Sequence, residues 1–414
     1  MKKVIFLAIA SLFLIKNKAI SQCYFKTDIK KYVDVNGQPC ATTVISAVPF
    51  LRITSDARGG AMGDVGIAVA TDANAMSYNT SKLVFADEKM GISATYTPWL
   101  RALGLNDMYL AYLAGYNKLN NRQAVGLSAR YFSLGEISFT DDSGAPTGTG
   151  SPNELEVSAG FAQKLTEKLS VGINGKFVYS NLAAGASVNG TTAKVGYAGG
   201  ADISMTYRTP IKVNGTKNNL SVGLAATSIG SKISYTSSAN KDYMPANLGL
   251  GVAYEMNINE FNTMTVAVDL NKLMVPSPQF RILTLPDDTT INNEDFDKNT
   301  NNIPDYKEYA PISSIFTSFG DAPGGFKEEL KEITYGIGLE YWYDKQFALR
   351  AGYFNENKLK GGRKYLTLGL GLKYNVFGLN FSYLVPTTTQ RNPLDNTLRF
   401  SLLFDFGAMS DNEE

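Results

Sequence analysis

Apolar and polar side chains alternate along fourteen segments of the chain between residues 90 and 406. In the last segment one face carries only large apolar side chains, whereas the other face is mainly polar. The apolar face holds Leu398, Phe400, Leu402, Phe404 and Phe406, and the other face holds Arg399, Ser401, Leu403 and Asp405. A period of two residues is typical of a β-strand whose two faces meet different surroundings. The segments therefore predict an all-β fold, and each is about as long as a tilted strand that crosses a bilayer.

The connections between these segments alternate in length. The long connections are 99–106, 135–153, 181–192, 231–246, 272–329, 357–363 and 386–396, and the short ones are 119–121, 165–167, 209–217, 258–260, 344–345 and 375–376. The exception among the short ones is 209–217, with nine residues. A membrane barrel has tight turns at one rim, long loops at the other and an even number of strands. We therefore predict a 14-stranded antiparallel transmembrane β-barrel over residues 90–406, followed by a C-terminal tail, 407–414.

The first 21 residues resemble a secretory signal peptide. Lys2 and Lys3 precede an apolar stretch that is too short to cross a bilayer as a helix, and small residues around Ser21 suit cleavage. The protein is therefore expected to be exported to the outer membrane. In an even-stranded barrel we expect both termini to be periplasmic, with residues 22–49 as an N-terminal periplasmic segment. The same parity places the longest loop, 272–329, outside the cell.

Composition narrows the possible chemistry. Removing the four lysines of the signal peptide changes the net charge from +1 to −3, so no basic field favours nucleic acid. The chain has no histidine, which excludes Ser-His-Asp and Cys-His hydrolases and histidine-ligated zinc. We therefore expect no enzymatic activity. Cys23 and Cys40 could form a disulfide in an oxidising periplasm, or they could both remain free thiols.

Residues 50–89 do not alternate and are rich in small and polar residues. Small residues allow close packing of backbone, and buried polar groups need partners. We predict that this segment threads the barrel lumen as a plug. Its candidate polar residues are Arg52, Asp56, Arg58, Asp64 and Asn79.

The run DARGGAMGD at 56–64, followed by Tyr78-Asn79, resembles the N-terminal region of the PorV family and of FadL-type barrels. Residues 321–330, DAPGGFKEEL, also resemble PorV, a barrel of the type IX secretion system. The resemblance implies 14 strands, a lumenal plug and a role in secretion. It further implies three kinds of partner, namely the giant translocon barrel, cargo with a C-terminal β-domain, and the surface attachment complex. The sequence Asn79-Thr80-Ser81 replaces the Asn-Pro-Ala of FadL itself, which argues against fatty-acid transport.

The longest loop contains a run with the spacing of an EF-hand calcium loop, residues 297–308. The candidate ligands are Asp297, Asn299, Asn301, Ile303 through its carbonyl, Asp305 and Glu308. Asn302 stands at the position that usually needs glycine, and asparagine tolerates the left-handed conformation better than most residues. The run predicts bound Ca²⁺, and the alternative is an asparagine-rich surface loop.

The same loop carries apolar residues in a segment expected to face water. They are Ile312, Ile315, Phe316, Phe319 and Phe326. Exposed apolar clusters usually mark an interaction site. We predict that Ile315, Phe316, Phe319 and Phe326 bind a partner, and the alternative is that the loop folds back and buries them.

Three functions are compatible with these observations. The first is a cargo shuttle of the type IX system that carries proteins from the translocon to the attachment machinery. The second is a FadL-like outer-membrane channel for hydrophobic small molecules. The third, a lipid-modifying enzyme, lacks a nucleophile and base at supporting spacing. Outer-membrane lipid is an expected partner in every case.

Overall fold

The computed structural model describes residues 24–26, 31–33, 43–101, 105, 107–140, 144–182, 187–188, 191–213, 215–236, 241–278, 281–284, 290–293, 301, 303–322, 325–387 and 396–407. The predicted signal peptide and most of the C-terminal tail lie outside these residues. Among the described helices, none is long and apolar enough to cross a membrane.

The chain divides into two units. The first comprises Met1–Ala41 and Arg281–Asn293, and the second comprises the remainder of the chain. In the first unit β1 (Tyr24–Lys26) pairs with β2 (Lys31–Val33), and β16 (Arg281–Thr284) pairs with β17 (Thr290–Asn293). Both pairs are antiparallel.

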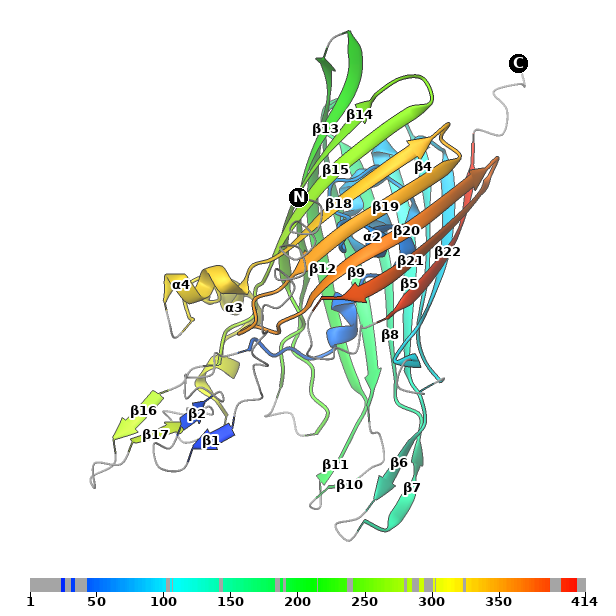
Figure 1. The fold of residues 1–414 in the computed structure, drawn as a ribbon. Helices are drawn as coiled ribbons and strands as arrows, with labels where there is room; N and C mark the ends of the chain where they lie inside the picture. Colours follow the sequence, from blue (N-terminus) through cyan, green and yellow to red (C-terminus); the bar gives the residue numbers. More distant parts are fainter. Residues whose placement is uncertain are drawn as a thin grey trace, which may run out of the picture. The chain divides into compact units, whose positions relative to one another are not determined.

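The second unit is a closed barrel of 14 strands in which neighbouring strands are antiparallel (Figure 1), as the alternation predicted. Its strands are β3 (Met90–Pro98), β4 (Met108–Asn120), β5 (Gln123–Leu134), β8 (Asn153–Lys164), β9 (Leu169–Asn181), β12 (Gly196–Val213), β13 (Thr216–Gly230), β14 (Asn247–Asn257), β15 (Asn262–Leu273), β18 (Thr334–Tyr343), β19 (Phe347–Asn355), β20 (Lys364–Tyr374), β21 (Phe377–Pro386) and β22 (Leu398–Phe406). The barrel closes where β22 pairs with β3, in a register that sets Phe406 opposite Met90.

The two faces of each strand differ as the sequence pattern predicted. On β18, Leu339 points outward and is 41% exposed, whereas its neighbour Glu340 points inward and is 1% exposed. On β22, Leu402 lies on the outer surface and Arg399 is buried inside. An apolar outer wall with a polar interior is the pattern of a barrel in lipid rather than of a water-soluble barrel.

Long and short connections fall at opposite ends of the barrel, which we call the long-loop end and the short-turn end. Besides the longest connection, which contains β16 and β17, two long connections contain small hairpins: β6 (Ile137–Thr140) with β7 (Pro146–Gly150) and β10 (Ser187–Val188) with β11 (Thr191–Thr192). The longest connection contains η5 (Asp305–Lys307), α3 (Pro311–Thr317), α4 (Phe326–Glu329) and η6 (Leu330–Glu332).

The exceptional short connection, 209–217, was wrongly predicted. Strand β12 continues to Val213 and β13 begins at Thr216, so the connection is as tight as the other short turns. Pairing of β12 with β9 ends where Tyr207 faces Leu169, so the two strands project past their neighbour as a hairpin. Polar residues and Pro210 make this water-exposed part resemble a loop, although proline is tolerated on a free strand edge.

Residues 49–86, which we call the lumen segment, lie inside the barrel. They form η1 (Pro49–Arg52), α2 (Ala57–Ala61), η2 (Ala73–Ser77) and η3 (Thr80–Phe85), and they contact inward-facing residues on strands around the ring. The contact is close because the strands carry glycine where the segment passes. A Cβ atom at Gly352 would lie 2.1 Å from the backbone nitrogen of Gly63. Small residues therefore allow the segment to pack against the wall.

The lumen segment is entered from the long-loop end. The backbone nitrogen of Ala47 donates to the carbonyl of Tyr243 in a long loop, 2.9 Å away. After the segment the chain reaches the short-turn end, where Lys118 donates to the carbonyl of Lys89. Residues 43–49 therefore lie at the opposite end from Phe406, and the prediction that 22–49 lies at the same end as the C-terminus is wrong for them. Strand parity cannot detect a segment that crosses the lumen before the first strand.

Candidate functional site

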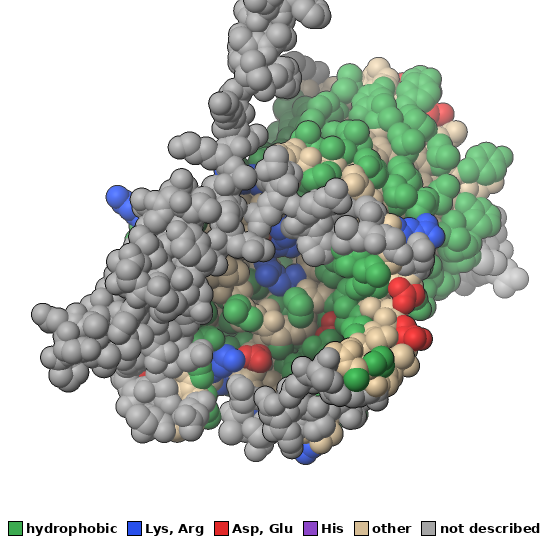
Figure 2. All heavy atoms as spheres, turned by 60° about the horizontal axis from the view of Figure 1, so that its bottom comes forward, with side chains coloured by type: hydrophobic (Ala, Val, Ile, Leu, Met, Phe, Trp, Pro, Cys, Tyr) green, Lys and Arg blue, Asp and Glu red, His purple; other side chains and the backbone are tan. Residues whose placement is uncertain are grey.

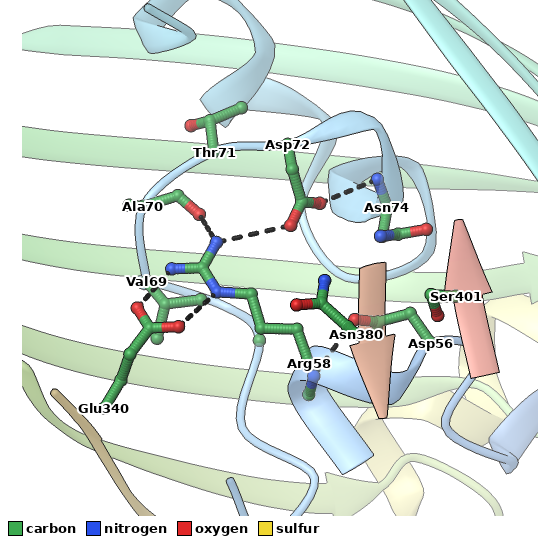
Figure 3. A network of polar contacts seen from close by, with 12 residues as sticks. Asp56, Arg58, Val69, Ala70, Thr71, Asp72, Asn74, Glu340, Asn380 and Ser401 are labelled. Atoms are coloured by element: carbon green, nitrogen blue, oxygen red, sulfur yellow. Dashed lines mark hydrogen bonds and ion pairs between the residues drawn. The ribbon is translucent and has the colours of Figure 1, made fainter. Parts of the chain in front are cut away.

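A buried carboxylate on the barrel wall holds the lumen segment (Figure 3). Arg58, in α2, donates from Nη2 to Glu340 Oε1 at 2.6 Å and from Nε to Oε2 at 2.8 Å. Arg350 on β19 donates to the same carboxylate at 2.7 Å. The third guanidinium nitrogen of Arg58 bonds to Ala70 and Asp72 within the segment. Two guanidinium groups thus compensate one buried carboxylate, which is the condition for an ion pair to be tolerated at low exposure.

Other strands hold the backbone of the lumen segment. Asp269 on β15 accepts from the amides of Gly66 at 2.7 Å and Ile67 at 2.9 Å. On β20 Thr367 accepts from Gly63, and on β22 Ser401 accepts from Ala57. These bonds satisfy amide groups that would otherwise be buried without partners. The segment is therefore attached on several sides of the ring.

The five residues predicted for the plug all make specific contacts. Arg52 lies 3.7 Å from Glu356. Asp56 caps α2 by accepting from Gly59 at 3.0 Å, and it also accepts from the Tyr78 hydroxyl at 2.6 Å. Asp64 accepts from the Tyr365 hydroxyl, and Asn79 donates to Ile67 O and Thr206 Oγ1 at 2.9 Å each. That the segment closes the lumen as a plug stays a prediction.

Among the wall residues that hold the segment, the charged residues Glu340, Arg350 and Asp269 were not predicted as site residues. Their signal in the sequence is a charged residue on the polar face of a strand. That signal marks an inward position but does not identify the partner, because Arg58 and Glu340 are 282 residues apart.

Cavities lie on both sides of the lumen segment. At the long-loop end a cavity of about 550 Å³ has mainly apolar walls that include Phe50, Trp99 and Phe132. At the short-turn end a cavity of about 450 Å³ is lined largely by polar residues, including Arg208 and Asn380. Figure 2 looks toward the long-loop end, where apolar side chains surround a hollow that contains basic side chains. The first cavity therefore has the size and the apolar lining of a ligand pocket.

Residues 311–332, which we call the loop arm, carry the predicted apolar cluster. Phe316 and Phe326 are each 75% exposed, and Phe319 is also exposed. Ile315 is only half-buried and lies with Tyr243 and other residues around a small cavity beside β13. The loop arm thus presents its aromatic side chains to solvent rather than folding them back, whereas Ile315 faces the barrel.

Buried ion pairs attach the loop arm to the barrel rim. Lys272 Nζ lies 3.0 Å from Glu329 and 2.5 Å from Glu332, and Lys360 Nζ lies 3.0 Å from Glu332. The amide of Ser277 donates to Asp321 at 2.9 Å. Burial raises the pKa of Asp321 to about 7; the Ser277 amide opposes this shift, and the nearby Glu329 and Glu332 add to it. The base of the arm is therefore rigidly held, and one of its carboxyl groups titrates near neutral pH.

The calcium-like run is only partly described. Ile303 N donates to Asn301 Oδ1 at 2.8 Å, Asn301 Nδ2 donates to Glu308 Oε1 at 2.5 Å, and Asp305 begins η5. Asp297 and Asn299 lie outside the described residues, as do Cys23 and Cys40. Within the described part of the chain no three His, Cys, Asp or Glu residues are placed to hold a metal ion. Calcium binding and the disulfide stay predictions.

The apolar outer wall, the polar interior and the segment inside it define a membrane β-barrel with an occupied lumen. The sequence model described as "Type IX secretion system protein PorV" matches residues 36–280, more than half of the chain, so the chain belongs to the PorV family. Its general partners are therefore components of the type IX secretion system, and the protein is not an enzyme.

Solved structures with a similar fold were also found. The P. putida toluene transporter TodX is 13% identical, with 86% of this chain and 99% of that chain covered and a TM-score of 0.48. The Ralstonia pickettii toluene transporter TbuX is 14% identical, with 85% and 98% covered and a TM-score of 0.45. A Pseudomonas aeruginosa FadL homologue is 10% identical, with 88% and 100% covered and a TM-score of 0.41. Identities this low say nothing about what this chain binds. No curated protein matches the sequence.

Proposed function

We propose that this protein receives cargo bearing a C-terminal β-domain at the translocon of the type IX system and delivers it to the surface attachment machinery. Membership of the PorV family supports a role in this system. In this proposal the long-loop end faces the cell exterior, because the longer loops of outer-membrane barrels are extracellular. The loop arm then projects on the side where secreted cargo emerges.

The observation that carries the proposal is the exposure of Phe316, Phe319 and Phe326 on an arm whose base is held by buried ion pairs. Large aromatic side chains contribute most of the binding energy in many interfaces, and a rigid base reduces the entropy lost on binding. A solvent-exposed loop without a partner would rarely expose several such residues. We therefore assign the loop arm as the surface that binds the translocon barrel or the cargo.

The test is copurification from native outer membranes. Phe316→Ser with Phe319→Ser should remove the copurifying partner while the barrel stays folded, as judged by its resistance to SDS before heating. Lys327→Ser, an exposed polar position on the same arm, is the matched control and should copurify like the unmodified protein. Unchanged copurification of the double variant would contradict the assignment.

The second candidate is a channel for hydrophobic small molecules. The apolar cavity at the long-loop end favours it. The lumen segment weighs against it, because the segment lies between this cavity and the one at the short-turn end. Uptake of a radiolabelled hydrocarbon by cells with and without the protein separates the candidates, since the secretion role predicts equal uptake.

A further inference from the structure

Arg399 on β22 is 1% exposed, and no carboxylate of the described residues forms an ion pair with it. Within the same residues, neither Nε nor Nη1 has a hydrogen-bond partner. Other basic residues around the same cavity are paired, since Arg363 lies 2.8 Å from Glu356 and Lys360 lies 3.0 Å from Glu332. A buried guanidinium without a partner is unfavourable, so the position needs an anion that the described chain does not supply.

The local packing gives Arg399 little freedom to leave. A Cβ atom at Gly60 in α2 would lie 2.8 Å from Nη1 of Arg399, so the lumen segment carries glycine where this side chain crosses it. The guanidinium is thus held between β22 and the lumen segment. Its position lines the cavity at the long-loop end.

Among the basic residues around this cavity, Arg399 is the one with no ion pair to a carboxylate of the described chain. Four basic residues line it, and three carboxylates accompany them; these are Arg52, Lys360, Arg363 and Arg399 with Asp64, Glu332 and Glu356. Asp64 is the remaining carboxylate without an ion pair among them, and its Oδ1 has no hydrogen-bond partner while Oδ2 accepts from Tyr365. Arg52 and Arg363 share Glu356, and Lys360 pairs with Glu332 and also with Glu328, 2.6 Å away. Asp64 forms no ion pair with Arg399, so within the described residues the Arg399 guanidinium has no carboxylate at ion-pair distance.

The remainder of the cavity is suited to a hydrocarbon chain. Its walls include Phe50, Trp99, Phe132, Leu134 and Leu273, and its volume of about 550 Å³ can hold one chain of moderate length. An inorganic anion alone would leave these walls without contacts. A neutral hydrocarbon would leave the guanidinium without a counter-charge.

We propose that this cavity binds a single-chain amphiphile whose anionic head group, a carboxylate or a phosphate monoester, pairs with Arg399. The hydrocarbon chain of such a ligand contacts the apolar walls, and its head group neutralises the guanidinium of Arg399. The proposal concerns binding at the long-loop end and requires no passage through the lumen. It therefore stands whether or not the protein shuttles cargo.

Trp99 provides a direct readout because it lines the cavity, whereas the other tryptophan, Trp342, lines the cavity at the short-turn end. In a Trp342→Phe background, quenching of fluorescence by ω-brominated probes reports on this cavity. The probes are ω-bromododecanoate, ω-bromododecyl phosphate and the uncharged ω-bromododecanol, added to the folded barrel in non-ionic detergent. At least one anion should quench at a concentration about tenfold or more below that of the alcohol, as expected for a charge-assisted hydrogen bond. The stronger anion identifies the head group.

Substitutions at Arg399 test the role of the charge. Arg399→Gln should reduce anion binding to the level of the alcohol, and Arg399→Lys, which keeps the charge, should retain the preference. Arg122→Gln, at an arginine whose side chain is 70% exposed in a short turn, is the control and should change nothing. Each variant must keep the SDS resistance of the folded barrel. Equal quenching by anions and alcohol, or anion binding unaffected by Arg399→Gln, would overturn the proposal.

Discussion

Replacing Glu340 with glutamine should loosen the lumen segment while leaving the shape of the side chain almost unchanged. The carboxylate accepts from Arg58 at 2.6 and 2.8 Å and from Arg350 at 2.7 Å. Glutamine removes the charge and leaves two guanidinium groups inside the lumen, of which only Arg58 keeps a carboxylate, Asp72, at 3.2 Å. Breaking a buried ion pair by removing one partner costs about 3–5 kcal/mol.

A matched control separates this cost from the general effect of a buried Glu→Gln change. Glu154 on β8 is also buried and accepts a hydrogen bond from Ser180 at 2.6 Å, and no described residue forms an ion pair with it. Glu154→Gln should therefore cost only about 1 kcal/mol. Adding Arg350→Gln to Glu340→Gln should recover part of the lost stability, because Arg350 is the guanidinium that loses its carboxylate partner, whereas Arg58 keeps Asp72.

Two measurements follow the change. Urea unfolding in liposomes, monitored by tryptophan fluorescence, gives the free energy of unfolding; Trp342 is a local reporter because Arg350 lies 5.3 Å from its ring centre. Hydrogen exchange of amides in 57–67 should become roughly a hundredfold faster in Glu340→Gln, which corresponds to the lower end of the expected cost. Equal effects of Glu340→Gln and Glu154→Gln would refute the reasoning, since the ion pairs would then contribute nothing specific.

Three further predictions concern topology, pH and metal. With both native cysteines replaced by serine, Thr43→Cys should react with a membrane-impermeant maleimide on intact cells, whereas Lys345→Cys in a short turn should react only after permeabilisation. Labelling of both positions from the same side would contradict the chain path, and the reverse pattern would contradict the orientation. Because burial raises the pKa of Asp321 to about 7, the folded arm binds this proton more tightly than the unfolded chain, and arm stability should fall as pH rises from about 4 to about 7. Hydrogen exchange in 311–332, corrected for intrinsic rates, should show this loss, and Asp321→Asn should remove the pH dependence. Calorimetry should detect Ca²⁺ binding that Asp305→Asn weakens, and absence of any calcium heat would exclude the site at 297–308.

Much of the barrel could be predicted because its determinants are local. The alternation along β18 and β22 follows from the two media that each strand meets. The positions of the short turns and the long loops follow from the alternating lengths of the connections. The hairpin at 209–217 was misread because its exposed part no longer separates lipid from lumen, so the pattern that identifies strands is absent there.

The contacts of the site could not be predicted in the same way. Five polar residues of the lumen segment were predicted, but their partners on the wall depend on the register between distant parts of the chain. Arg399 was assigned only to the polar face of its strand, and nothing in the local pattern shows that it lacks a counter-ion. The sequence predicted that the segment threads the lumen but not the end at which it enters, because counting strands determines only where β3 begins and β22 ends.

The central claim is that the loop arm meets a protein partner outside the membrane, and site-specific photo-crosslinking in cells tests it most directly. A benzoylphenylalanine at Phe316 should form an adduct with a second protein of the type IX system, whereas the same probe at Leu339, on the outer wall of β18, should not. If the probe at Phe316, like the probe at Leu339, forms no adduct with another protein, the account is contradicted.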